Sequence, residues 1–138
     1  MKIILSIILL FLSAQSFANL SGKGLLCTFL NNSKPEAYYF ISDRRFNYMS
    51  IKLVNDTYSI YYRGEKNYQT DIDFIYLADF AKVNRKTLEF FINSYPKEPW
   101  GKCEAYNSNE IEALKEKHND MRMLLQEKYN KKLEGNKI

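Results

Sequence analysis

The sequence of 138 residues has only one histidine and two cysteines, and this shortage excludes several kinds of site. A zinc site needs several cysteine, histidine or carboxylate ligands that converge, and the supply here is too small. A serine or cysteine nucleophile would have to use His118 as its base, and no nucleophile motif stands near that residue. We therefore expect no metal site, no cofactor and no enzymatic activity.

The sequence also lacks an apolar run long enough to cross a membrane as a helix. The longest run, residues 3–12, has about half of the ~20 apolar residues that a spanning helix needs. It follows Lys2 and precedes a short segment with Ser16 and Ala18 at the positions expected before a cleavage site. We therefore expect residues 1–18 to be a cleavable signal peptide and the mature protein to be periplasmic or secreted.

The excess of positive over negative charge is small as well. Twenty basic and sixteen acidic residues leave a net charge of +4, and the basic residues are dispersed. This excess is too weak to indicate a nucleic-acid partner. The pairs Arg44-Arg45 and Arg85-Lys86 could bind an anion, or they could be ordinary exposed turn residues.

The two cysteines stand at opposite ends of the expected β-domain, residues 19–106. Cys27 lies in the first strand-like run after the signal peptide and Cys103 in the last. Export leads to an oxidising compartment, which favours a Cys27–Cys103 disulfide over two free thiols. Closing a loop of about 77 residues would stabilise the fold by ~4 kcal/mol on the chain-entropy argument.

The aromatic content indicates a β-rich fold. Eleven tyrosines and nine phenylalanines fall mainly in strand-like segments. The expected strands are residues 25–30, 37–41, 47–54, 57–63, 68–77, 88–94 and 101–106. Turn residues at 64–67 and the prolines within 95–99 separate strands. In the fifth of these strands, the residues expected to share one face are Tyr68, Ile72, Phe74 and Tyr76.

A hairpin around Asn55-Asp56 is the best-determined piece. A two-residue loop there pairs Val54 with Thr57. The register that follows is Leu53 opposite Tyr58, Ile51 opposite Ile60, and Met49 opposite Tyr62. All six side chains then share one face of the hairpin. A register shift of one residue would move the apolar side chains of one strand to the opposite face.

The last element changes to a helical period. Asn107 and Glu110 have the spacing of a capping box. The apolar stripe that follows is Ile111, Leu114, His118, Met121 and Leu125. We expect one amphipathic helix over 108–134, within a C-terminal unit of residues 107–138. Its second half, from about Leu124 to Lys132, should project past the sheet, where it could self-associate, touch an anionic membrane or remain a solvated end.

Three carboxylates are the candidates for acid–base chemistry. Asp71 and Asp73 point to one face of the strand 68–77, and Glu89 could join them across the sheet. The alternative is a solvated strand face. His118 lies on the apolar side of the helix, where a packed residue is the simpler interpretation than a ligand or base.

Four aromatic residues form the candidate contact surface: Tyr95, Trp100, Tyr106 and Tyr129. Exposed aromatic side chains mark surfaces that bind partners. The alternative is that Trp100 closes an open end of the β-domain.

Residues 22–27 (GKGLLC), residues 84–88 (NRKTL) and the pair Cys103-Glu104 together resemble a family of small exported bacterial proteins of unknown function. The resemblance implies export, a β-fold and a terminal disulfide, and it implies no activity. A looser similarity links the chain to periplasmic C-type lysozyme inhibitors, which are small β-barrels with cysteines near both ends. Those proteins carry a Ser-Gly loop that enters the lysozyme active site, and this chain has no counterpart of it.

These observations predict a mainly β member of the α+β class. We expect an antiparallel sheet or partly closed barrel of about seven strands with a C-terminal amphipathic helix. The expected function is that of a non-enzymatic binding or accessory protein for a small ligand or a protein partner. The alternatives are an inhibitor of a cell-wall hydrolase, through the loop at 95–100, and a small hydrolase that uses Asp71, Asp73 or Glu89.

Overall fold

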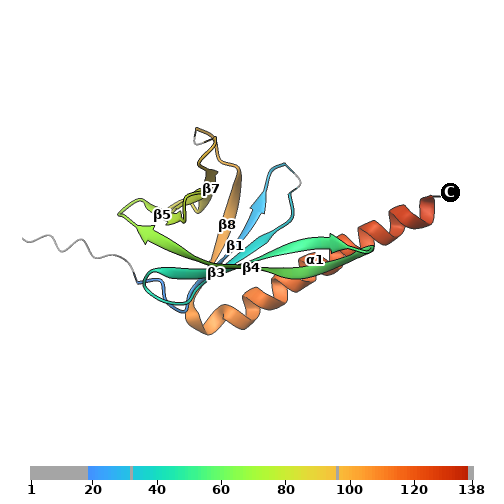
Figure 1. Ribbon diagram of the computed structural model, residues 1–138, viewed down its shortest axis with the longest axis horizontal. Coiled ribbons are helices and arrows are strands. Elements are labelled where there is room, and N and C mark those ends of the chain that lie inside the picture. The colour runs from blue at the N-terminus through green and yellow to red at the C-terminus, as the bar shows by residue number, and fades with distance from the viewer. Residues whose placement is uncertain (1–18, 32, 96, 137–138) are drawn as a thin grey trace, which may run out of the picture.

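The computed structural model describes residues 19–31, 33–95 and 97–136 (Figure 1). The strands are β1 (Gly24–Phe29), β2 (Glu36–Phe40), β3 (Arg45–Val54), β4 (Thr57–Thr70), β5 (Phe74–Leu77), β6 (Ala81–Asn84), β7 (Glu89–Ile92) and β8 (Gly101–Tyr106). They are followed by a short 3-10 helix η1 (Ser108–Glu110) and a long helix α1 (Ile111–Gly135). No helix in these three ranges has the length and apolar character needed to span a membrane. The expected signal peptide, residues 1–18, lies outside the described residues.

The eight strands pair in sequence order, and β8 returns to β1, which closes an antiparallel barrel. The predicted mainly β fold with a C-terminal helix is confirmed, with one strand more than expected. At the closing seam Cys27 lies directly opposite Cys103. The two form the predicted disulfide, with their Cα atoms 4.0 Å apart, and both are buried in the barrel core.

Aromatic side chains fill the barrel. The buried members are Tyr38, Phe40, Phe46, Tyr68 and Phe90, with aliphatic side chains between them. The rings of Tyr38 and Tyr48 stack with centroids 5.7 Å apart, and Phe40 meets Tyr68 edge to face at 4.8 Å. Such pairs stabilise a core beyond the area that they bury. The interior is therefore a packed core, as in other small barrels.

The β3–β4 hairpin has the predicted register, with Leu53 opposite Tyr58, Ile51 opposite Ile60 and Met49 opposite Tyr62. Asn55 and Asp56 form its turn with φ values of 49° and 63°, as a type I′ turn requires. Phe46 points into the barrel core. Strand alternation therefore turns Met49 outward, where it packs against the cluster that includes Leu114 of α1.

β4 is longer than predicted, and the expected turn at residues 64–67 is wrong. These residues continue the strand because they pair with residues 45–48 of β3. Gly64 has a φ of 113° at the place where the β3–β4 register shifts. A glycine adopts this conformation without strain, so the bulge absorbs one extra residue and the pairing continues.

The predicted strand 68–77 is two strands in the structure. β4 ends at Thr70, and a turn leads into β5 at Phe74. Tyr68 is buried, but on β5 the buried side chains are Ile75 and Leu77. The predicted shared face is therefore wrong after Tyr68, because the turn resets the alternation.

The helical segment begins at η1 with the predicted capping box of Asn107 and Glu110. The backbone N–H of Asn107 donates to the Glu110 carboxylate at 3.0 Å, and the N–H of Glu110 donates to the Asn107 carbonyl at 2.9 Å. The helix crosses the outside of the barrel (Figure 1), and Leu114 packs there against Leu26 and Ala37. This contact forms a second, smaller core outside the barrel.

The distal half of α1 was predicted to project past the sheet from about Leu124, but it still contacts the sheet at Gln126 and Tyr129. The β3–β4 hairpin extends beyond the barrel beside it (Figure 1). Gln126 accepts a hydrogen bond from the Tyr58 N–H at 2.7 Å and donates to the Asp56 carbonyl at 3.0 Å. The Tyr129 hydroxyl donates to the Asp56 carboxylate at 2.5 Å. The prediction was wrong because β3 and β4 are longer than expected, so the tip of their hairpin contacts the helix as far along as Tyr129.

Candidate functional site: an apolar groove beside the helix

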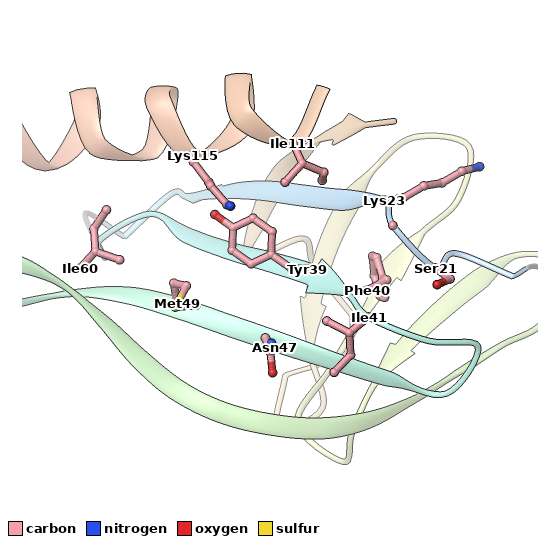
Figure 2. A pocket seen from close by; sticks show the side chains of 11 residues that line it. Ser21, Lys23, Tyr39, Phe40, Ile41, Asn47, Met49, Ile60, Ile111 and Lys115 are labelled. Atoms are coloured by element: carbon pink, nitrogen blue, oxygen red, sulfur yellow. The ribbon is translucent and has the colours of Figure 1, made fainter. Parts of the chain in front are cut away.

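A groove lies on the outside of the barrel, between the start of α1 and the outer faces of β2, β3 and β4 (Figure 2). Its volume is 710 Å³, which falls in the range of pockets that hold small ligands. The apolar lining comes from Tyr39, Ile41, Met49, Ile60 and Ile111, and Lys23 and Lys115 stand at its rim. We call this site the Tyr39 groove.

Strand alternation explains how the same strands serve both the barrel core and the groove. Tyr38 points into the barrel core, and its neighbour Tyr39 packs on the helix side. The helix covers the adjoining surface around Leu26 but leaves this part open. Ile41 and Ile60 remain 45% and 38% exposed. Uncovered apolar surface of this kind marks a contact or ligand site.

The rim of the groove carries positive charge. Figure 2 shows Lys115 on α1 directed toward the ring of Tyr39, with Lys23 at the other end. Lys115 also pairs with Glu112 at 3.1 Å, on an exposed helix face where such pairs are weak. Within the described part of the chain, no carboxylate forms an ion pair with Lys23. The groove therefore offers the Lys115 ammonium group to an anion, whereas the Lys23 side chain lies at the rim and extends away from the other lining residues (Figure 2).

Tyr39 supplies a hydroxyl at the middle of this site. Burial raises the pKa of Tyr39 to about 12, and the nearby Glu112 carboxylate adds to the rise. The hydroxyl is therefore protonated at neutral pH and can donate a hydrogen bond. A second polar point is Asn47, whose side-chain oxygen accepts a bond from the Tyr62 hydroxyl at 3.1 Å.

The three candidate carboxylates do not converge. Asp71 lies in the turn between β4 and β5, where one oxygen accepts the backbone N–H groups of Asp73 and Phe74 at 2.8 and 2.7 Å. The hydrogen bond from the Tyr76 hydroxyl is the largest of the contacts that lower the pKa of Asp71. Glu89 lies on β7, which β6 separates from β5 and from this turn. Asp71 thus acts as the cap of its own turn.

The candidate anion-binding arginines are engaged elsewhere. Arg45 forms an ion pair with Glu65 at 2.7 Å. Arg85 donates to the backbone carbonyl of Asp71 at 2.6 Å. Both contacts hold neighbouring turns and strands together.

The four candidate aromatic residues lie in three separate regions. Tyr95, 60% exposed, and Trp100 belong to the β7–β8 connection, and Trp100 packs against the barrel core. Tyr106 packs against the core under α1. Tyr129 meets Tyr58 edge to face at 5.9 Å near the hairpin tip. They do not form one surface, and the packing of Trp100 fits the alternative that it closes the barrel.

His118 is a packed residue at the helix–barrel interface. It is fully buried, and its Nε2 donates to the carbonyl of Pro35 at 3.1 Å. Burial lowers its pKa, and the hydrogen bond to Pro35 offsets part of that effect. A neutral histidine in this position joins α1 to the β1–β2 connection.

A polar pair on the inner face of β2, with Tyr38 buried and Glu36 partly buried, was not predicted from the sequence. Glu36 lies directly opposite Cys27, and the hydroxyl of the fully buried Tyr38 donates to its carboxylate. Burial raises the pKa of Glu36, against smaller lowering effects of Tyr38 and Arg63. Strand alternation could have predicted this pair, because Glu36, Tyr38 and Phe40 fall on the same face of the strand as the inward aromatic residues.

Among residues 19–31, 33–95 and 97–136, no three histidine, cysteine or carboxylate side chains gather as metal ligands. Comparisons of the chain with family models, with curated proteins and with solved structures found no match. The chemistry of the Tyr39 groove is therefore the basis of the proposed function.

Proposed function

We propose that this chain is an exported, non-enzymatic binding protein and that the Tyr39 groove holds an amphiphile with an apolar body and an anionic group. The observation that carries the proposal is an open apolar groove with the Lys115 ammonium group beside the Tyr39 hydroxyl and Lys23 at the rim. Such a site combines an apolar lining with a few polar groups that fix orientation, which is the usual composition of ligand sites.

The chemistry of the ligand follows from the lining. Ile41, Met49 and Ile60 favour an apolar chain, because burying it removes about 25 cal/mol per Å² of apolar area from water. Lys23 and Lys115 favour a carboxylate, sulfate or phosphate group over a cationic one. The Tyr39 hydroxyl offers that group a further hydrogen bond.

Export is supported by the Cys27–Cys103 disulfide and by the signal-like N-terminal sequence. Disulfides persist in oxidising compartments such as the periplasm and the extracellular space. The ligand is then one that this protein meets outside the cytoplasm.

Calorimetric titration with dodecanoate and with dodecyltrimethylammonium tests the proposal, because the two share a chain and differ in charge. We expect dodecanoate to bind and the cation to bind about tenfold more weakly or not at all. The variant Ile41→Asp should abolish binding, and Lys23→Gln with Lys115→Gln should remove the preference for the anion. Lys86→Gln, in the remote β6–β7 turn, is the matched control. Equal binding of both probes would contradict the proposal.

The alternative of a hydrolase inhibitor rests on a different place, the β7–β8 connection with its exposed Tyr95. An inhibitory loop would lose its effect when this side chain is removed. Lysozyme activity measured with the wild type and with Tyr95→Ala separates the two functions, because the dodecanoate titration does not involve this loop.

A further inference from the structure

β4 changes its pairing partner along its length. It runs for 14 residues, and residues 57–67 pair with β3 while residues 68–70 alone pair with β5. The Asn67 carbonyl also accepts the Ala78 N–H at 2.9 Å. Residues 57–66 therefore form an edge strand where the β3–β4 hairpin leaves the barrel (Figure 1).

The hydrogen bonds of the Tyr58 backbone show which backbone groups of β4 point toward this edge. Its N–H donates to Gln126 at 2.7 Å and its carbonyl accepts from Arg122 at 3.2 Å, so both point away from β3. Antiparallel ladders alternate, which directs the N–H and carbonyl groups of Ile60 and Tyr62 to the same edge. The helix covers Tyr58, and no strand of the described chain pairs with Ile60 or Tyr62 along this edge.

The side chains along this edge are apolar and uncovered. Ile60, Tyr61 and Tyr62 are 38%, 48% and 52% exposed. Ile60 and Tyr62 share the face that borders α1, and Tyr61 lies on the opposite face. An open edge with exposed apolar side chains on both faces is a template for an added strand.

Basic side chains near this edge indicate the charge that an added strand should have. Lys52 lies with its Nζ 5.0 Å from the centre of the Tyr61 ring, on the face opposite α1. Arg63 and Lys66 follow along β4, and the one acidic residue between them, Glu65, pairs with Arg45 at 2.7 Å. A second copy of this chain would bring the same cations together, whereas acidic side chains would complement them.

We propose that the edge of β4 at Ile60 and Tyr62 binds an extended polypeptide segment of alternating apolar and acidic residues as an additional strand. Its backbone pairs with Ile60 and Tyr62. Its apolar side chains lie beside those two residues, and its acidic side chains lie beside Lys52 and Arg63. This site takes a polypeptide, and it shares Ile60 with the lining of the Tyr39 groove.

Amide hydrogen exchange, followed residue by residue with NMR, tests the proposal on the wild-type chain. In the free protein the amides of Ser59 and Tyr61, which face β3, should exchange slowly, and those of Ile60 and Tyr62 quickly. A capped peptide of alternating valine and glutamate should slow Ile60 and Tyr62 about tenfold or more. The same peptide with lysine for glutamate should not. Unchanged exchange with the acidic peptide, or equal protection by both peptides, would overturn the proposal.

Two variants make the test specific for the backbone. Ile60→Pro removes an outward N–H without removing a bond to β3, so it should abolish peptide binding, and Ile60→Val should retain it. Circular dichroism shows whether the Ile60→Pro variant is folded. If this variant is unfolded, the exchange of the wild-type amides with the two peptides tests the proposal by itself. Protection of Ile60 and Tyr62 that rises with protein concentration, without peptide, would show self-pairing and would also overturn the proposal.

Discussion

The backbone N–H of Tyr58 on β4 donates a 2.7 Å hydrogen bond to the side-chain oxygen of Gln126 on α1. The same side chain donates to the Asp56 carbonyl at 3.0 Å. One glutamine thus satisfies two backbone groups at the hairpin tip and covers the end of an otherwise open strand edge. The hairpin and the helix are therefore expected to hold each other in place outside the barrel.

Gln126→Ala should lower the free energy of unfolding by about 1 kcal/mol, because two backbone groups lose their partner while water replaces part of the loss. Urea denaturation measures this change. Glu127→Ala, at the next position of the helix, removes an exposed pair with Lys131 and should cost less. Equal losses from the two variants would mean that the Gln126 contacts add nothing.

Truncation separates the supporting part of α1 from its free end. A chain that ends after Asn130 keeps Gln126 and Tyr129 and should melt close to the full-length protein. A chain that ends after Arg122 should keep the barrel but show faster amide exchange at the hairpin tip. Sedimentation of both chains reports on the self-association predicted for the helix. Unfolding of the barrel in the shorter chain would refute this division.

The hairpin register predicts opposite outcomes for two neighbouring residues. Ile51 is 3% exposed and faces α1, so Ile51→Asp should destabilise by about 3 kcal/mol through an unpaired charge in an apolar contact. Lys52 is exposed and stacks on Tyr61, so Lys52→Asp should cost about 1 kcal/mol or less. Thermal melting of both variants checks the difference, and similar losses would contradict the faces assigned here.

The disulfide should stabilise the barrel without being needed to form it. Cys27→Ala with Cys103→Ala should lower the free energy of unfolding by about 4 kcal/mol on the chain-entropy argument. The β1–β8 ladder still pairs residues 24–29 with residues 101–106, which should preserve a native circular dichroism spectrum. An unchanged denaturation midpoint would show that the crosslink does not restrict the unfolded chain.

Glu36 should make stability fall as the pH rises from acid toward neutral. Burial raises its pKa in the folded state above the ordinary value of 4.5, so the folded protein holds the proton more tightly than the unfolded chain. Its contribution is present below pH 4.5 and is lost as the pH rises through the raised value.

Glu36→Gln keeps an acceptor for the Tyr38 hydroxyl and removes the titrating group. The variant should therefore gain stability relative to the wild type at neutral pH and lose that gain in acid. Urea denaturation across this pH range measures the difference, with Glu127→Gln as a control for the loss of one charge. A stability difference that does not vary with pH would contradict the burial argument.

Local patterns in the sequence were sufficient for several elements. Alternation around Asn55-Asp56 predicted the hairpin register, because a tight turn fixes which residues face each other. The capping box of Asn107 and Glu110 located the start of the helical segment for the same local reason. The two cysteines predicted the closing contact between the ends of the β-domain, since they are the only pair available.

Long-range pairing decided the remainder. Residues 64–67 have the composition of a turn, yet β3 supplies partners for them, and Gly64 absorbs the mismatch in register. Strand pairing turned Glu36 inward beside Tyr38, and the strand order placed Asp71 before β5 and Glu89 on β7. The Tyr39 groove and the open edge of β4 arise because α1 covers part of the outer sheet surface and leaves the rest exposed. No spacing along the chain encodes where one element stops covering another, so these features exist only in the folded protein.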